Sequence, residues 1–232
     1  MFYGIDSYYI ILVLPAIIFA MIAQGRVTSA FNRYSKERTR KGITGADAAR
    51  AVLQANGVSD VRIEMVAGNL TDHYDPRTNV IRLSENVYNA DTVAAVGVAA
   101  HEAGHAVQYA YGYVPIKIRS AIIPVSQIGS TLAMPMIFIG IILNAFSLIK
   151  IGIVFFAAAV VFQLITLPVE FNASNRAIDA IASTGILYED ELPGAQKTLS
   201  AAALTYVAAL LVSLAQFIRL LLIFGGGRRN RD

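Results

Sequence analysis

Two histidines and a glutamate stand together in the segment His101-Glu102-Ala103-Gly104-His105. Residues four apart on an α-helix share one face, so the two imidazoles can converge on one metal ion. Glu102 projects about 100° around the helix from His101, at the edge of that face. Zinc lowers the pKa of a bound water toward about 7 and polarises a carbonyl, and a neighbouring carboxylate can take the proton. The spacing predicts a zinc site with Glu102 as general base, which is the chemistry that peptide-bond hydrolysis needs.

The surroundings of this HExxH segment favour a metal site over an accidental match. The chain has three histidines, and two of them are here. Small or apolar residues flank the segment and no proline interrupts it, as expected of a helix buried beneath an active site. The alternative is a pair of solvated histidines, and an apolar helix disfavours it because unpaired buried polar groups are costly.

A catalytic zinc usually has three protein ligands and an open position for water. A third histidine at the spacing HExxHxxGxxH is absent, because Gln108 and Tyr111 occupy the glycine and histidine places. The third ligand is therefore expected downstream, and Glu170 in LPVEFNASNRAIDAIAS is the best candidate. Glu189 and Glu191, in an acidic loop, are competing candidates for the third ligand. The alternative role for Glu170 is that of a carboxylate at a helix N-terminus, where the helix macrodipole stabilises it.

Composition places these residues in a membrane protein. Of the 232 residues, 56% are hydrophobic and 15% charged, whereas a soluble domain carries about 25% charged residues. The net charge is only +3 and the basic residues cluster beside apolar stretches, which indicates contact with the lipid bilayer and no nucleic-acid partner. The chain has no cysteine, which excludes disulfides and thiolate metal sites.

Four apolar stretches are candidate spans: 8–23, 122–146, 148–167 and 201–224. The first is interpreted as a retained anchor, because a signal peptide would have a basic segment before it and here the basic residues follow. The middle two predict a helical hairpin. Two spans therefore separate His101 from Glu170, which puts both residues on the same side of the membrane.

A small domain with helices and strands lies between the first two spans. Thr44 or Gly45 can cap a helix over residues 46–56, and residues 61–66 alternate as a strand does. A second strand follows a turn at Asp75-Pro76. Asp91 then predicts the N-cap of the helix that carries the HExxH segment, which ends near residue 112.

These residues carry a resemblance to a known family. AAHEAGHAVQ, preceded by LTDHYDPRTNVIRLS and followed by PVEFNASNRA, resembles the neutral zinc metallopeptidases of bacterial membranes, the YugP-like family, over nearly the whole chain. The order of anchor, HExxH, hairpin and glutamate is more distantly similar to the HtpX-like membrane proteases. In those proteases an Asp follows the ligand Glu by four residues, whereas this chain has Ser174 there and Asn175 next.

The resemblance implies a multi-pass protein of the bacterial cell membrane with zinc on His101 and His105 and general-base chemistry at Glu102. The expected fold class is an α-helical multi-pass membrane protein with a small α+β zincin-like catalytic domain. Six parts are predicted: an N-terminal membrane anchor (1–24), a basic juxtamembrane segment (25–41), the zincin-like domain with HExxH (42–118), a transmembrane helical hairpin (121–168), a third-ligand helix with an acidic loop (169–199), and a C-terminal apolar helix with a basic tail (200–232).

Other polar residues near the expected site have weaker assignments. An edge strand near the metal pairs with extended substrate in zinc peptidases of this type, so His73 or Tyr74 can approach an oxyanion; the alternative is a half-exposed histidine at a strand end. Arg176 and Asp179 can support the site electrostatically.

Basic residues flank the predicted domain and favour the cytoplasmic side of the membrane. They are Arg26, Arg33, Lys36, Arg38, Arg40, Lys41, Lys117 and Arg119. The expected active site is therefore cytoplasmic. The tail disagrees, because Arg228, Arg229 and Arg231 would end outside if the last stretch spans fully.

The predicted function is a metalloendopeptidase acting on polypeptide substrates in or beside the membrane. A silent scaffold or chaperone that retains a structural zinc is the main alternative, and Glu102 disfavours it because a structural site needs no base. A transporter is disfavoured because the predicted spans hold few ionisable residues.

Overall fold

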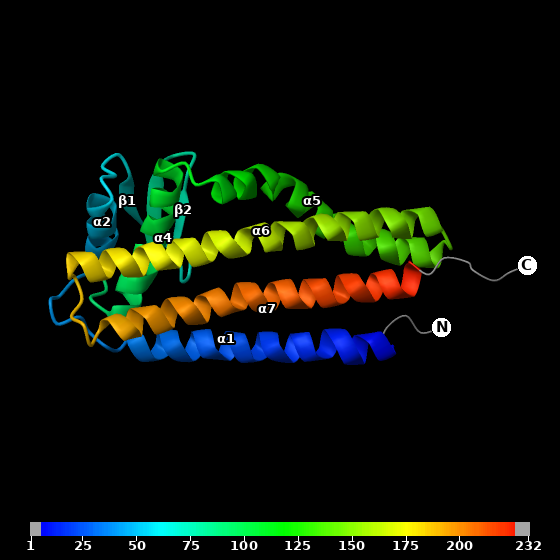
Figure 1. The fold of residues 1–232 in the computed structure, drawn as a ribbon, viewed down its shortest axis with the longest axis horizontal. Coiled ribbons are helices and arrows are strands. Elements are labelled where there is room, and N and C mark those ends of the chain that lie inside the picture. The colour runs from blue at the N-terminus through cyan, green and yellow to red at the C-terminus, as the bar shows by residue number, and fades with distance from the viewer. Residues whose placement is uncertain (1–5, 226–232) are drawn as a thin grey trace, which may run out of the picture. The chain divides into compact units, whose positions relative to one another are not determined.

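The computed structural model describes residues 6–225. The chain is mostly helical, with one small sheet (Figure 1). In chain order the elements are η1 (Tyr9–Val13), α1 (Leu14–Tyr34), α2 (Gly45–Ala55), β1 (Arg62–Val66), β2 (His73–Asp75), β3 (Val80–Ser84), α3 (Glu85–Tyr88), α4 (Val93–Ala110), α5 (Val114–Ile142), α6 (Phe146–Thr184) and α7 (Leu192–Phe224).

Four helical segments are long and apolar enough to cross a membrane: Tyr9–Tyr34, Val114–Ile142, Phe146–Thr184 and Leu192–Phe224. Each exceeds the roughly 20 residues that a span requires. The chain therefore has the fold class expected in outline, a helical membrane protein with a small α+β part. The basic tail with Arg228, Arg229 and Arg231 lies outside the described residues.

The helices extend further than the apolar stretches predicted. α1 continues to Tyr34 through part of the basic segment, and α7 begins at Leu192, within the predicted acidic loop. Pro193 suits this start, because proline is tolerated in the first turn of a helix where its missing N–H has no partner. α6 is continuous through Pro168, so the second arm of the hairpin and the predicted third-ligand helix form one helix. Neighbouring helices in a membrane protein can accommodate such a proline.

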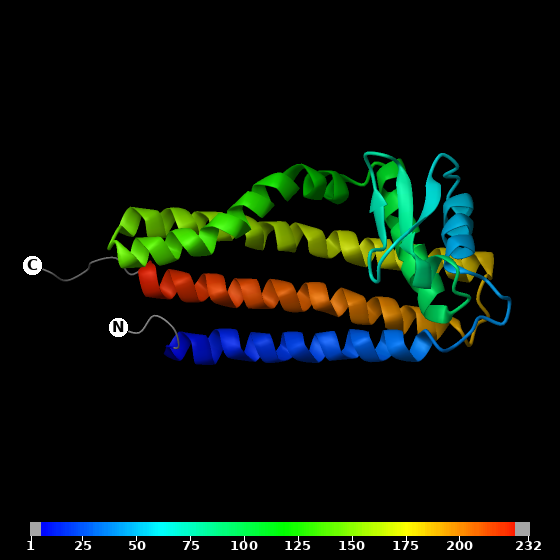
Figure 2. The ribbon, with the colours of Figure 1, turned by 180° about the vertical axis from the view of Figure 1, so that it is seen from behind.

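The chain forms two compact units, and the first consists of helical segments. Its described part comprises residues 6–23, 118–167 and 205–225. α5 contains Pro124 and Pro135 and changes direction along its length (Figure 2). A cluster of buried residues joins α5, α6 and α7 in this unit: Ile137, Ile149, Ile153 and Leu220.

The second unit comprises Gln24–Lys117 and Pro168–Leu204. Its sheet has the order β1-β3-β2, with β1 parallel and β2 antiparallel to β3. The predicted second strand is a hairpin, with β2 before the turn and β3 after it. Asp75 makes this turn, because its carboxylate accepts hydrogen bonds from the Arg77 N–H at 3.0 Å and the Thr78 hydroxyl at 2.7 Å.

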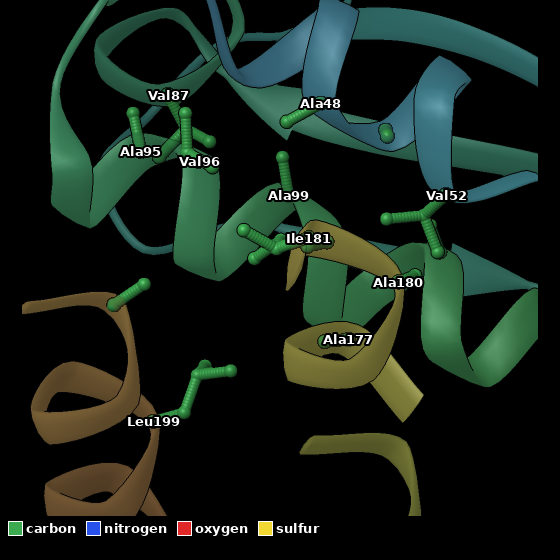
Figure 3. Packing of buried hydrophobic residues seen from close by; sticks show 14 of the residues in the cluster. Ala48, Val52, Val87, Ala95, Val96, Ala99, Ala177, Ala180, Ile181 and Leu199 are labelled. Atoms are coloured by element: carbon green, nitrogen blue, oxygen red, sulfur yellow. The ribbon is translucent and has the colours of Figure 1, made fainter. Parts of the chain in front are cut away.

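α4 lies at the centre of the second unit. Figure 3 shows its buried side chains Val96 and Ala99 between α2 on one side and segments of α6 and α7 on the other. The helix begins at Val93 and its N-cap is Thr92, one residue after the predicted cap Asp91; the Thr92 hydroxyl accepts a hydrogen bond from the Ala95 N–H at 3.3 Å. The backbone carbonyl of Asp91 accepts a hydrogen bond from the Thr39 N–H. The core around α4 fixes the helix that carries the HExxH residues.

Candidate metal centre

His101 and His105 lie one turn apart on α4, with ring centroids 4.7 Å apart and nearly perpendicular planes. Both Nε2 atoms point toward one carboxylate oxygen of Glu170 on α6. The His101 Nε2 lies 3.2 Å from Glu170 Oε2, and the His105 Nε2 lies 3.6 Å from the same oxygen. The Glu170 side chain is only 1% exposed. The structure thus brings together three predicted ligands from two helices 65 residues or more apart in sequence.

The three residues make a donor set that a metal ion could use. One ligand atom from each of His101, His105 and Glu170 lies within 4.8 Å of the other two. Within residues 6–225, no other group of three or more His, Cys, Asp or Glu side chains converges in this way. Two imidazoles and a carboxylate are a ligand set known in catalytic zinc sites.

The opposite edge of each imidazole has a polar neighbour of its own. The His101 Nδ1 lies 3.1 Å from the Ser174 hydroxyl, and the His105 Nδ1 lies 3.0 Å from the Gln108 side-chain oxygen. Histidines that bind metals almost always have such a partner on the second nitrogen, which fixes the ring. The residues present therefore fit a metal ion at the two Nε2 atoms and the Glu170 carboxylate.

Close packing of α4 on α6 makes this convergence possible. A Cβ atom at Gly104 would lie 2.6 Å from the Ala173 carbonyl oxygen, closer than real Cβ contacts. Gly104 lies between the two histidines in sequence, and Ala173 lies one turn after Glu170. The missing side chain therefore lets the helices approach at the level of the ligands.

Glu102 is half-buried and held by the backbone of the sheet. Its Oε2 accepts a hydrogen bond from the Tyr74 N–H at 3.0 Å. β2 is an edge strand, so this N–H faces away from β3 and toward α4. The carboxylate is therefore oriented by a group that cannot rotate away.

The carboxylates control the ionisation of the second histidine. Burial by itself would lower the pKa of the His105 imidazole. The hydrogen bond to Glu170 and the charges of Glu102 and Glu170 act in the opposite direction, and they raise the pKa above its ordinary value. The site thus concentrates negative charge and favours a cation between these groups.

The side chains of β2 have partners away from the histidines. The His73 ring is exposed, and its Nδ1 donates to the Thr71 carbonyl at 2.7 Å. The Tyr74 hydroxyl donates to the Asn79 side-chain oxygen at 2.7 Å. Burial, together with nearby acidic groups, raises the pKa of Tyr74 to about 12, so this hydroxyl keeps its proton at neutral pH. The contribution of β2 to Glu102 is therefore its backbone N–H.

The competing acidic residues lie elsewhere. Glu189 is exposed, and the Glu191 carboxylate accepts from the backbone N–H groups of Arg40 and Tyr188, each at 2.8 Å. Asp179 is also exposed. Arg176 donates from Nε to the Asn172 side-chain oxygen at 2.9 Å, which joins it to the polar groups behind His105.

Sequence reasoning missed Gln108 and Gly104. Gln108 stands in the glycine place of the pattern HExxHxxGxxH, and three residues after His105 it also shares a helix face with that histidine. This spacing was the available signal. No sequence signal indicates the role of Gly104, because this role depends on the approach of α6.

The comparisons with known proteins agree with this picture. The sequence model of the family described as "Putative neutral zinc metallopeptidase" matches residues 9–225. The chain is 49% identical over 221 residues to the "Putative membrane protease YugP" of Bacillus subtilis (strain 168), covering 95% of this chain and 98% of that protein. No solved structure matches the chain. The resemblance found in the sequence is confirmed, and the chain belongs to the family described as "Putative neutral zinc metallopeptidase".

Proposed function

We propose that this chain is a membrane zinc metallopeptidase that cleaves polypeptides, with zinc held by His101, His105 and Glu170. The observation that carries the proposal is the convergence of both Nε2 atoms on the buried Glu170 carboxylate, beside a second carboxylate at Glu102. The family description and the name of the Bacillus subtilis relative support the same activity.

Three protein ligands would leave one coordination position of a zinc ion open for water. Zinc with three protein ligands supplies a Lewis acid and lowers the pKa of a coordinated water toward about 7. Glu102 is the base that takes the proton from the attacking water and then delivers it to the leaving amine. The Tyr74 N–H holds Glu102 Oε2 at 3.0 Å, so the other carboxylate oxygen remains to accept this proton.

The proposed substrates are polypeptides in or beside the membrane. Four membrane-capable helices keep the protein in the bilayer, so its substrates must reach it there. The basic residues after α1, such as Lys36 and Lys41, support a cytoplasmic position for the centre by the positive-inside rule.

The decisive experiment compares wild type with Glu102→Gln as full-length protein purified in detergent. Zinc content and cleavage of an unfolded polypeptide are measured on the same samples. We expect about one zinc in both proteins and cleavage only by wild type, because glutamine cannot accept the proton. Glu189→Gln is the matched control, since Glu189 is exposed and outside the centre, and it should retain activity.

The possible failures separate the competing functions. Wild type that binds zinc but cleaves no polypeptide, like Glu102→Gln, would favour a zinc-binding scaffold or chaperone. Wild type without stoichiometric metal would refute the proposed metal centre itself.

A further inference from the structure

Gln108 is a completely buried amide, one turn beyond His105 on α4. Its nitrogen donates to the Val169 carbonyl at 2.8 Å and to the Asn172 side-chain oxygen at 3.0 Å. Its oxygen lies 3.0 Å from the His105 Nδ1. A buried amide is costly unless its groups are satisfied, and here both ends have partners.

The partners of Gln108 determine which end of its amide faces the histidine. The Val169 carbonyl can only accept a hydrogen bond, so the Gln108 group facing it must be the NH2. The Asn172 oxygen gives the same answer independently. Because the Arg176 Nε can only donate, and lies 2.9 Å from this oxygen, Asn172 presents an acceptor to Gln108 as well.

The oxygen end of the Gln108 amide determines which nitrogen of the His105 ring carries the proton. The Gln108 oxygen can only accept, so the His105 Nδ1 must carry a hydrogen. In a neutral imidazole, a proton on Nδ1 leaves the lone pair on Nε2, the atom that faces Glu170. The proton position is thus set by residues that are not themselves in the donor set.

We propose that Gln108 is a positioning residue that holds His105 as the Nδ1–H tautomer, and that Asn172 and Arg176 fix the orientation of the Gln108 amide. Gln108, Asn172 and Arg176 together are called the amide network. The inference rests on the proposed function, because the Nε2 lone pair is useful only if His105 binds a metal. It assigns to Gln108, Asn172 and Arg176 a contribution to metal affinity made without contacting the metal.

The hydrogen-bond partner of His101 does not fix the tautomer of its ring in this way. Its Nδ1 lies 3.1 Å from the Ser174 hydroxyl, which can donate or accept. The hydroxyl can therefore accompany either tautomer of His101, whereas the amide network permits one tautomer of His105.

The test uses two substitutions at one position. Asn172→Asp keeps an oxygen that accepts from both Gln108 and Arg176, whereas Asn172→Leu removes it. We expect zinc affinity, measured by competition with a chelator, to be unchanged for Asn172→Asp and about 10–100-fold weaker for Asn172→Leu. Gln108→Met, which keeps the length but removes the amide, should weaken affinity similarly. Asn175→Leu, at an exposed position on the same helix, is the control and should bind as wild type does.

A spectroscopic readout reports the tautomer directly. The chain has only three histidines, so selective 15N labelling gives three pairs of ring-nitrogen signals, one Nδ1 and one Nε2 for each ring. In wild type and Asn172→Asp we expect an Nδ1–H of His105 that exchanges slowly with water, both with zinc and without zinc at alkaline pH. Asn172→Leu and Gln108→Met should lose this protection, while circular dichroism shows that helical content is kept.

The outcomes distinguish this inference from the proposed function. If Asn172→Leu binds zinc as tightly as wild type and keeps the protected Nδ1–H, the inference is wrong, although zinc binding and cleavage by wild type would leave the proposed function intact. If wild type binds no zinc, the proposed function fails and the zinc-free spectra still decide the tautomer. Should Gln108→Met not fold, the pair at Asn172 gives the answer alone.

Discussion

Replacing Gly104 with alanine should pull the candidate metal centre apart. The new Cβ would lie 2.6 Å from the Ala173 carbonyl oxygen and 3.2 Å from its carbonyl carbon. Relaxed contacts between carbon and a carbonyl oxygen begin near 3.3 Å, so α4 and α6 must separate by about 0.7 Å. Metal–ligand distances tolerate only about 0.2 Å, and Glu170 lies one turn from the contact. We expect zinc affinity to fall by at least about tenfold.

The same change should lower stability. Overpacking a close contact costs about 1–3 kcal/mol, and the replacement of a helical glycine by alanine returns about 0.5–1 kcal/mol. These two contributions leave a net loss of about 0–2.5 kcal/mol, centred near 1 kcal/mol, and a loss of about 1 kcal/mol corresponds to a decrease in apparent Tm of about 2–4 °C for a chain of this length. Thermal unfolding in detergent and chelator competition measure the two effects on the same preparation.

Gly97→Ala is the matched control on the same helix. A Cβ at Gly97 would meet Ala195 at 3.6 Å, an ordinary contact. This variant should keep its zinc affinity and gain about 0.5–1 kcal/mol from the better helix former. If Gly104→Ala were as stable as Gly97→Ala and bound zinc like wild type, the close approach of α4 and α6 would not be what positions the ligands.

Hydrogen bonds from the Thr78 hydroxyl and from Arg82 hold the pKa of Asp75 below its ordinary value of 3.8. The Asp75 carboxylate therefore stabilises the fold above pH 3.8, and this stabilisation is lost as pH falls through the folded pKa. Asp75→Asn should cost about 1–2 kcal/mol at pH 7 in denaturant unfolding, and its difference from wild type should shrink as pH is lowered. Arg219 is 8% exposed and donates to Asp6 at 2.5 and 2.9 Å; Asp6→Ala should cost about 1–3 kcal/mol in thermal unfolding, because it removes charge-assisted hydrogen bonds while Arg219 keeps its contact with Gln216, and Asp6→Asn should cost less. A single cysteine at the exposed position 50 of this cysteine-free chain should react with a membrane-impermeant maleimide only after the cells are opened; labelling of intact cells would contradict a cytoplasmic centre.

The residues of the candidate centre were predictable because their signals are local. Helical spacing puts His101 and His105 on one face, and Glu170 follows an even number of spans, so each choice needed only nearby sequence and a count of crossings. The strand pairing was less accessible. The turn at Asp75-Pro76 was predicted, but the three residues before it were too short a run to be identified as an arm of a hairpin.

The features that were not predicted depend on packing between distant segments. Gln108 interacts with Val169 and Asn172, about 60 residues later in the chain, and only the packing of α4 on α6 brings them together. The continuity of α6 through Pro168 was missed for a related reason. The local rule that proline ends a helix is strong in water, and surrounding helices relax it in ways that a single segment does not reveal.

Within residues 6–225, neither imidazole has a carboxylate behind it, and this bears on how the proposed centre would work. His101 is supported by the Ser174 hydroxyl and His105 by the Gln108 amide, so both supporting groups are neutral. A carboxylate at either place would raise the basicity of the ligand and neutralise part of the charge of a bound cation. With Glu170 as the single anionic ligand, a divalent ion would keep a net positive charge toward the substrate carbonyl. Glu102, held by the Tyr74 N–H, would then be the negative group next to that charge, where a base for the attacking water is needed.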